Sequence, residues 1–180
     1  MNVKLVRFPN DADWMAVKAR ALRTVHREAK KEPTLEWKSR ILEARHSPIR
    51  YLQFSFFLED IPTKVANHLV RHVHAQPYVE SNRNDRQSAM TDAEVNRLTP
   101  VSMFLDVNAE ELMVIANKRL CAQAEKDTRE VVRMMCGEVI KHCPEFKGLL
   151  VPMCEYQGYV CHEMQPCGAY PHWRNRRDEE

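Results

Sequence analysis

The order of apolar and polar positions in the amino-terminal part of the chain predicts helices and strands joined by short polar connections. Asp11 and Thr34 are suitable N-caps, because their side-chain oxygens can accept hydrogen bonds from the first turn of a helix. Ser47-Pro48 favours a loop, since the residue before proline is pushed out of helical geometry. The expected elements are a strand over residues 4–8, a helix that starts at Asp11 and ends before residues 30–33, a helix over residues 34–42, a loop over residues 45–50, a strand over residues 51–58 and a helix from Asp60 to Val70.

One long helix is expected to dominate the carboxyl-terminal half. Asn108 with Glu111 forms an N-cap pattern for it. Its apolar positions recur at helical spacing as far as Val139, and Cys143-Pro144 should end it. This helix would be the longest element of the fold.

Two shorter elements flank that helix. Thr91 and Glu94 form a capping-box pattern for a short helix, and the apolar residues 149–153 resemble a strand. Because helices outnumber strands in a mixed order, the expected fold class is α+β. We expect one domain over residues 1–148, with residues 149–180 as a cysteine-bearing tail packed on it.

Composition and charge narrow the function classes. The chain has 180 residues, 44% apolar and 29% charged, which suits an ordinary globular domain. A net charge of +2 is too small to attract nucleic acid or anionic lipid to the whole molecule, so neither partner is expected. No apolar run has the length of a membrane helix or the features of a secretion signal. The six cysteines are therefore predicted to be reduced thiols in the cytoplasm.

A basic cluster follows the helix that ends near Val70. Arginine side chains at a helix end and in the polar stretch after it can form bidentate hydrogen bonds with a phosphate or a polarised carbonyl. A solvated basic surface balanced by Glu80 and Asp85 is the alternative. The cluster consists of Arg71, His72, Arg83 and Arg86, with Arg97 and Arg119 as further candidates.

Two groups of residues could hold a metal. His68 and His72 lie four residues apart on one helical face near His74, but the glutamate of a zinc-protease motif is missing. The second group has thiol and imidazole ligands near turn residues, and buried or free thiols are the alternative. It comprises Cys154, Cys161 and Cys167 with His162, and Cys143 or His172 as further candidates for a structural zinc site.

Other enzyme classes lack their motifs. The chain has no GxSxG nucleophile elbow, and its four glycines do not form a phosphate-binding loop. Nucleophilic hydrolysis and P-loop chemistry are therefore not expected.

One motif resembles the signature of a known family. Arg71-His72-Val73, seven further residues and Ser81-Asn82-Arg83 are similar to the signature of the flavin-dependent thymidylate synthases, which is Arg-His-Arg, seven residues, Ser, one residue and Arg. Flanking segments match in the same order, and the resemblance covers about residues 1 to 140. These segments are Ser47-Pro48 before the aromatic strand, Val107-Asn108-Ala109, Leu112-Met113, Lys118-Arg119 and Ala122-Gln123.

The resemblance implies an α+β fold and a homotetramer with sites between subunits. It also implies FAD as cofactor and methylation of dUMP, or a related pyrimidine nucleotide, to dTMP, with methylenetetrahydrofolate as carbon source and NADPH as hydride source. Arg119 would stabilise a uracil ionised at N3 as the catalytic residue. The nucleotide would be bound by His68, Arg71, Ser81, Asn82, Arg83 and Arg97, and the flavin by Ser47, Arg71, His72 and Asn108.

Several residues depart from the family pattern. Val73 replaces the last arginine of the signature triplet, Val79 replaces a glutamate, and Glu110 replaces an arginine that contacts the flavin. A second hypothesis therefore stays open: a catalytically inert or altered-specificity pyrimidine-nucleotide-binding or interaction protein on the same fold, with or without a structural zinc. A metal-dependent hydrolase that uses the three histidines is the third.

Overall fold

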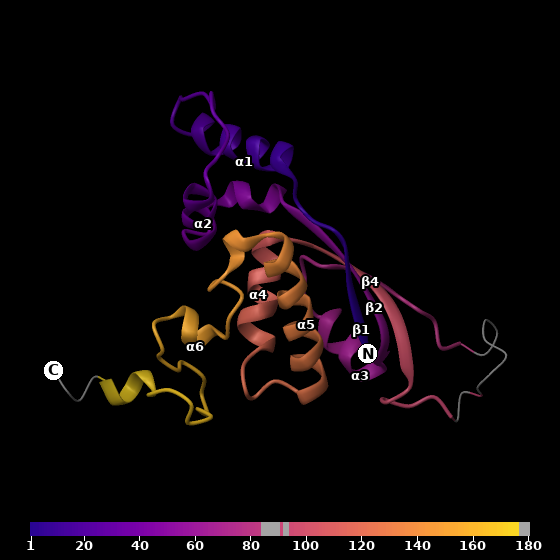
Figure 1. The fold of residues 1–180 in the computed structure, drawn as a ribbon. Coiled ribbons are helices and arrows are strands. Elements are labelled where there is room, and N and C mark those ends of the chain that lie inside the picture. Colours follow the sequence, from indigo (N-terminus) through magenta and orange to yellow (C-terminus); the bar gives the residue numbers. More distant parts are fainter. Residues whose placement is uncertain (84–90, 92–93, 177–180) are drawn as a thin grey trace.

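The centre of the fold is a four-stranded antiparallel sheet with strand order β1-β2-β4-β3. The computed structural model describes residues 1–83, 91 and 94–176 (Figure 1). The strands are β1 (Asn2–Arg7), β2 (Gln53–Pro62), β3 (Gln76–Val79) and β4 (Pro100–Asn108). The α-helices are α1 (Asp11–Arg23), α2 (Leu35–Glu43), α3 (Thr63–Leu69), α4 (Ala109–Arg119), α5 (Lys126–His142) and α6 (Met153–Tyr156), and three 3₁₀ turns are η1 (Ser47–Tyr51), η2 (Pro144–Phe146) and η3 (Trp173–Arg176).

Side chains along β2 and β4 alternate between buried and more exposed positions, so one face of the sheet is buried. Phe54, Phe56 and Leu58 of β2 point into the core, and the residues between them are partly exposed. In β4 the alternating residues Leu105 and Val107 pair with the inward residues of β2. The two central strands thus contribute one continuous apolar surface.

The helices α4 and α5 cover that surface side by side (Figure 1). Phe146, in the turn after α5, packs edge-on against Phe54 at 5.4 Å between ring centroids. The short helix α3 follows β2 directly and lies against α5. As a result, the end of α3 and the end of α4 lie over the same region of the core.

The prediction of one long helix from Asn108 to Cys143 was wrong, because residues 120–125 separate α4 from α5. Glu125 starts the second helix by accepting a hydrogen bond from the Thr128 N–H at 2.9 Å. Arg129 donates to the carbonyl of Ala122 at 2.6 Å, which satisfies a backbone group that the break exposes.

Some other elements also differ from the prediction. Asn10, not Asp11, caps α1, in a capping box with Asp13. The predicted loop over residues 45–50 contains η1, because Pro48 suits the first turn of a helix. The strand β2 continues past residue 58, through a bulge, to Pro62.

In the carboxyl-terminal half, residues 94–98 form turns where a helix was predicted, and residues 92–93 of that prediction lie outside the described part of the chain. Residues 149–153 do not form the predicted strand, since Pro152 caps α6 there. The sequence pattern had assigned no element to β3 or β4.

The start of the tail, at α6, lies beside α4, on the opposite side from α5 (Figure 1). Asn117, buried in α4, donates to the Val151 carbonyl at 2.8 Å. Arg45 donates to the Tyr156 hydroxyl at 3.1 Å and stacks on its ring. These contacts connect the start of the tail to the body of the fold. None of the helices in the described ranges combines the length and apolarity needed to span a bilayer.

Candidate functional site

Three residues at the end of α3 differ in how exposed their side chains are. Val70 ends the helix with an N–H that bonds to the Ala66 carbonyl, and the chain then turns back. Arg71 is exposed, whereas His72 is buried, with 8% of its surface accessible. His68, one turn earlier, is half-buried. The turn therefore sends one cation outward and one imidazole toward α4.

Arg119, in the last turn of α4, reaches that imidazole. Its Nε–H donates to Nε2 of His72 at 3.1 Å, and its Nη2 donates to the carbonyl of His68 at 3.0 Å. A cation at a helix carboxyl end is stabilised by the exposed carbonyls there. Burial and the nearby Arg71 lower the pKa of Arg119 from its ordinary value, although the guanidinium stays charged at neutral pH. The predicted catalytic arginine is thus held by both histidine residues.

The other ring nitrogen of His72 contacts a buried carboxylate. Nδ1 of His72 lies 3.0 Å from Oε1 of Glu111, and only 5% of the Glu111 surface is accessible. Burial and the charge of Arg119 lower the pKa of His72, against the opposing effect of Glu111. The lowered pKa favours the neutral imidazole at physiological pH.

His68 belongs to a second chain of hydrogen bonds. Its Nδ1 lies 2.8 Å from the Thr128 hydroxyl, which donates to Glu125 at 3.0 Å. Burial opposes ionisation of Glu125, but hydrogen bonds from the Thr128 N–H and from Lys64 prevail and lower its pKa to about 2. For His68, burial followed by the charges of Arg119 and Arg71 lowers the pKa. Both histidines of the site are thus neutral bases.

Three of the predicted arginines act electrostatically on His68. Arg119, Arg71 and Arg97 each lower its pKa. Arg97 comes from the segment before β4, where its carbonyl accepts the Lys64 N–H at 2.9 Å. Residues that are distant in the sequence thus form one region of positive potential at α3.

Two cavities open beside these residues. The first, about 290 Å³, is lined by His72, Arg119 and residues after α4. The second, about 430 Å³, lies at the start of α4 and is lined by Asn108, Glu110 and Glu111, among others. The Glu111–His72 pair separates the two cavities. The predicted catalytic residue Arg119 and the predicted flavin residue His72 therefore line the first cavity, and the predicted flavin residue Asn108 lines the second.

The second half of the signature lies at the other end of α3. Asn82 donates to the Thr63 hydroxyl at 3.3 Å, at the first residue of α3. The Arg83 N–H donates to the Ser81 hydroxyl at 3.3 Å, and the Arg83 side chain is exposed. Asn82 thus lies at the first residue of α3, whereas Arg119 bonds to its last turn. The candidate Arg86 and its expected counter-ion Asp85 fall outside the described residues.

The remaining predicted flavin contacts lie around the start of α4. Ser47 is exposed at the start of η1, and the side-chain oxygen of Asn108 caps α4 by accepting the Glu111 N–H at 2.9 Å. Glu110, which replaces a family arginine, forms an ion pair with Arg50. That pair offsets the negative charge that would otherwise face an anionic cofactor, so the donors here fit a flavin.

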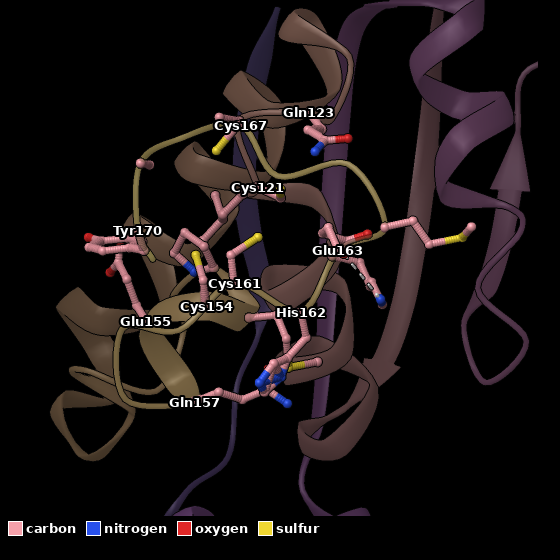
Figure 2. A pocket seen from close by; sticks show the side chains of 17 residues that line it. Cys121, Gln123, Cys154, Glu155, Gln157, Cys161, His162, Glu163, Cys167 and Tyr170 are labelled. Atoms are coloured by element: carbon pink, nitrogen blue, oxygen red, sulfur yellow. Dashed lines mark hydrogen bonds and ion pairs between the residues drawn. The ribbon is translucent and has the colours of Figure 1, made fainter. Parts of the chain in front are cut away.

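The cysteines predicted to bind zinc line a third cavity, of about 420 Å³, between the end of α4 and the tail. Figure 2 shows Cys121, Cys154 and Cys161 around the middle of this cavity, with Cys167 at its upper rim near Gln123. Cys161 is buried and its backbone is bonded to residues 171 and 173, whereas Cys167 is exposed on a separate turn.

No three His, Cys, Asp or Glu side chains in the described part of the chain converge as metal ligands. The zinc set Cys154, Cys161 and Cys167 is therefore not assembled. The histidine set is not assembled either, because His68 and His72 bond to Thr128 and Glu111.

Sequence reasoning missed two acidic residues of the site. Glu111 was assigned only to a cap pattern, yet its side chain holds His72. Its position four residues before buried Ile115, on the apolar stripe of α4, was the available signal. Glu125 had no such signal, because its role depends on the break between α4 and α5.

The solved structures similar to this chain include two thymidylate synthase structures and a UMP/dUMP methylase. The thymidylate synthase ThyX from Helicobacter pylori, solved with FAD and dUMP, matches with a TM-score of 0.67 at 13% identity, over 83% of this chain and 99% of that chain. A second structure of a Helicobacter pylori ThyX with FAD and dUMP matches with a TM-score of 0.63 at 13% identity, over 82% of this chain and 98% of that chain. The UMP/dUMP methylase PolB from Streptomyces cacaoi, bound with 5-Br dUMP, matches with a TM-score of 0.62 at 16% identity, over 83% and 96% of the two chains.

The sequence itself matches no protein-family model and no curated protein. The chain nevertheless has the α+β fold of the flavin-dependent thymidylate synthases, which confirms the fold that the signature predicted. At these identities the likeness establishes the fold, and activity has to be argued from the site.

Proposed function

We propose that this protein methylates dUMP to dTMP, or a closely related pyrimidine nucleotide to its methylated product, in an FAD-dependent reaction. Methylenetetrahydrofolate would provide the carbon and NADPH the hydride. The observation that carries the proposal is the guanidinium of Arg119, fixed by His72 and by the His68 carbonyl beside a cavity.

Arg119 has the chemistry that a uracil ring requires. A guanidinium has five N–H donors, and the two hydrogen bonds to the histidine residues use two of them. The others can donate to a uracil oxygen or to N3 after ionisation. A preorganised donor stabilises developing negative charge without reorganising during the reaction. Arg119 would thus act as an electrostatic catalyst.

The phosphate of the nucleotide would be bound by the other cations of the region. Arg71 and Arg97 are exposed and add to the positive potential at His68. Arginine binds phosphate in a bidentate manner, which suits a nucleotide monophosphate. His68 is neutral, and with Nδ1 directed at Thr128 its Nε2 can accept a hydrogen bond from the nucleotide.

The flavin would be held by Ser47, Arg71, His72 and Asn108. Arg50 keeps Glu110 paired there, which limits repulsion of an anionic cofactor. When bound, FAD would supply hydride transfer between NADPH and the one-carbon unit. His72 would keep a neutral ring between the two cavities.

The proposal includes an assembly of subunits. Within one chain, Asn82 bonds to the first residue of α3 and Arg119 to its last turn, so a neighbouring copy would contribute Ser81 and Arg83 to the nucleotide. This arrangement favours a homotetramer with shared sites.

We further propose that residues 1–148 form the catalytic domain with residues 149–180 packed on it. We also propose that the protein acts in the cytoplasm, where its six free cysteines stay reduced.

A second candidate function is binding of a pyrimidine nucleotide without turnover. Val73 is 85% exposed where the family signature has an arginine, so a charged donor near the flavin and folate is missing. The Arg50–Glu110 pair also replaces a cationic contact to the cofactor. These features favour a protein that keeps the nucleotide site and has lost part of the cofactor site.

A flavin titration separates the two candidates. The purified protein would be titrated with FAD, with and without dUMP, by visible absorbance and flavin fluorescence. Flavin binding strengthened by dUMP, followed by dTMP formation with methylenetetrahydrofolate and NADPH, is the result expected of the enzyme. Binding of dUMP without flavin binding would establish the second candidate, and binding of neither would refute both.

A further inference from the structure

We infer that Glu111 is a positioning residue that orients Arg119 through His72, and thereby sets how the guanidinium is presented to the nucleotide. The inference rests on the proposed function, because the role of Arg119 at a nucleotide belongs to that function. Glu111 is not part of the family resemblance, and its position at the start of α4 does not by itself indicate a site residue.

The direction of the hydrogen bonds follows from the chemistry of the three side chains. An arginine Nε–H can only donate, so Nε2 of His72 must accept the bond from Arg119. The ring proton must then reside on Nδ1, which lies 3.0 Å from a carboxylate that can only accept. The chain therefore runs from Arg119 through His72 to Glu111, with every hydrogen directed toward the carboxylate.

No other arrangement of protons satisfies these contacts. A proton on Nε2 would face the Arg119 Nε–H and leave the buried Glu111 carboxylate without the His72 donor. A doubly protonated ring would place a second cation 3.1 Å from the guanidinium nitrogen. Glu111 thus selects the tautomer, because its ionised oxygen is the acceptor that makes Nδ1–H the favoured form.

Burial of Glu111 and His72 strengthens the preference for the tautomer protonated on Nδ1. Glu111 is 5% accessible and His72 is 8% accessible, so water cannot readily replace either partner. Glu111 and Arg119 lie eight residues apart on α4, which is about 12 Å along a helix axis. A single rigid helix therefore carries both ends of the relay, and the residue that bridges them comes from the end of α3.

The same contact lies between the two cavities. Glu111 lines the one at the start of α4, and His72 lines the one beside Arg119. Loss of the carboxylate would let the imidazole rotate or change tautomer, and the Arg119 Nε–H would lose its acceptor. The guanidinium would then be held only through its bond to the His68 carbonyl.

Two substitutions at Glu111 test whether orienting His72 requires the negative charge of this side chain or only an oxygen acceptor. Glu111→Gln keeps an oxygen acceptor for Nδ1–H, whereas Glu111→Ala removes it. Glu130→Gln is the matched control, because Glu130 is an exposed glutamate on α5 that pairs only with Arg133 among the described residues. The readouts are ¹⁵N NMR of the His72 ring, the Arg119 Nε–H signal, and affinity for dUMP, all on the full-length chain.

The wild type should show a neutral His72 protonated on Nδ1 and a slowly exchanging Arg119 Nε–H. Glu111→Ala should mix the tautomers, abolish that signal and weaken dUMP binding about tenfold or more. Glu111→Gln should restore all three readouts to within about threefold of the wild type, and Glu130→Gln should not change them.

A wild-type His72 protonated on Nε2 would overturn the inference, even if Glu111→Ala fails to fold. Unchanged NMR signals in a folded Glu111→Ala variant would overturn it as well. If the NMR results are as expected but the wild type does not bind dUMP, the relay stands and the proposed function fails.

Discussion

The Arg119 region and the cysteine-bearing tail both contain the residue types of a functional site, yet they are built differently. In the Arg119 region, each polar side chain bonds to a partner from another element: His72 to α4, His68 to α5 and Arg119 to the end of α3. In the tail, the cysteines line a cavity without converging, and the chain is held by backbone hydrogen bonds such as that from Cys161 to Pro171.

The comparison shows that the chemistry open to a side chain depends more on the groups that it contacts than on its residue type. The histidines were candidates for metal binding, but burial and the charge of Arg119 lower their pKa values and favour the neutral rings. Their ring nitrogens bond to Thr128 and Glu111. The cysteines also had ligand chemistry, but nothing brings three of them to one point. The following predictions test this contrast, from the largest expected effect to the smallest.

Removing a packed side chain from residues 1–148 should lower the free energy of unfolding far more than removing an exposed side chain from the tail. Phe146→Ala removes a fully buried ring that packs against Phe54 and should lower the free energy of unfolding by about 3–5 kcal/mol. Met164→Ala, at a tail side chain that is 97% exposed, should change it by less than about 0.5 kcal/mol. Urea denaturation of both variants measures this, and equal effects would remove the contrast.

Loss of the guanidinium proposed to be catalytic should lower turnover far more than loss of another surface charge. Arg119→Ala should lower turnover by about 10²–10³-fold with the fold retained, because a preorganised donor to the uracil is lost. Arg133→Ala removes an exposed arginine that pairs with Glu130, and it should leave turnover unchanged. Turnover of dUMP and circular dichroism provide the comparison. Undiminished turnover in Arg119→Ala would refute its assigned role.

Substitution of a buried cysteine should destabilise the fold more than substitution of an exposed one. Burial raises the pKa of the Cys143 thiol to about 12, which marks an apolar environment. Cys143→Ser should therefore destabilise the fold by about 1–3 kcal/mol, since it buries a hydroxyl. Cys167→Ser, at an exposed position, should have almost no effect. Metal analysis should find no stoichiometric zinc, and one zinc per chain lost in Cys161→Ser would contradict this prediction.

The free energy of unfolding should depend on pH as expected of two histidines that are neutral in the folded protein. Burial and the charge of Arg119 lower the folded-state pKa of both His68 and His72, so below pH 6.5 the unfolded chain binds more protons than the folded one. Stability should then be complete above the ordinary histidine pKa and decrease as the pH falls below it. Thermal denaturation at pH 7.5 and 5.5 tests the sign, and His72→Asn should reduce the loss. A rise in stability at the lower pH would show that the rings are charged.

Local patterns predicted much of the fold, because caps and periodicity act over short distances. Thr34 caps α2 and Asn108 caps α4 as expected. The alternation of Val101, Met103 and Leu105 in β4 is also a local pattern, but no strand was predicted there. The break after Leu120 was not predicted, because Lys64 and Arg129, which stabilise it, act from outside the segment.

The same limit applies to the candidate site. The signature and its flanking segments predict Arg71, His72 and Arg119 as site residues, since such motifs are local patterns. The roles of Glu111 and Glu125 depend on contacts between helices that are distant in the sequence. Such contacts follow from the packing of α3, α4 and α5, which a single sequence does not specify.

The short connection between α4 and α5 also has a consequence for sequence change. Helix lengths in the core are constrained by packing, but residues 121–124 are exposed or partly exposed. An insertion of one residue there would be tolerated by the fold. An insertion that the connection did not absorb would shift the first turn of α5 and displace the Thr128 hydroxyl from His68. In related sequences, the length of this connection should therefore be more conserved than the identities of its residues.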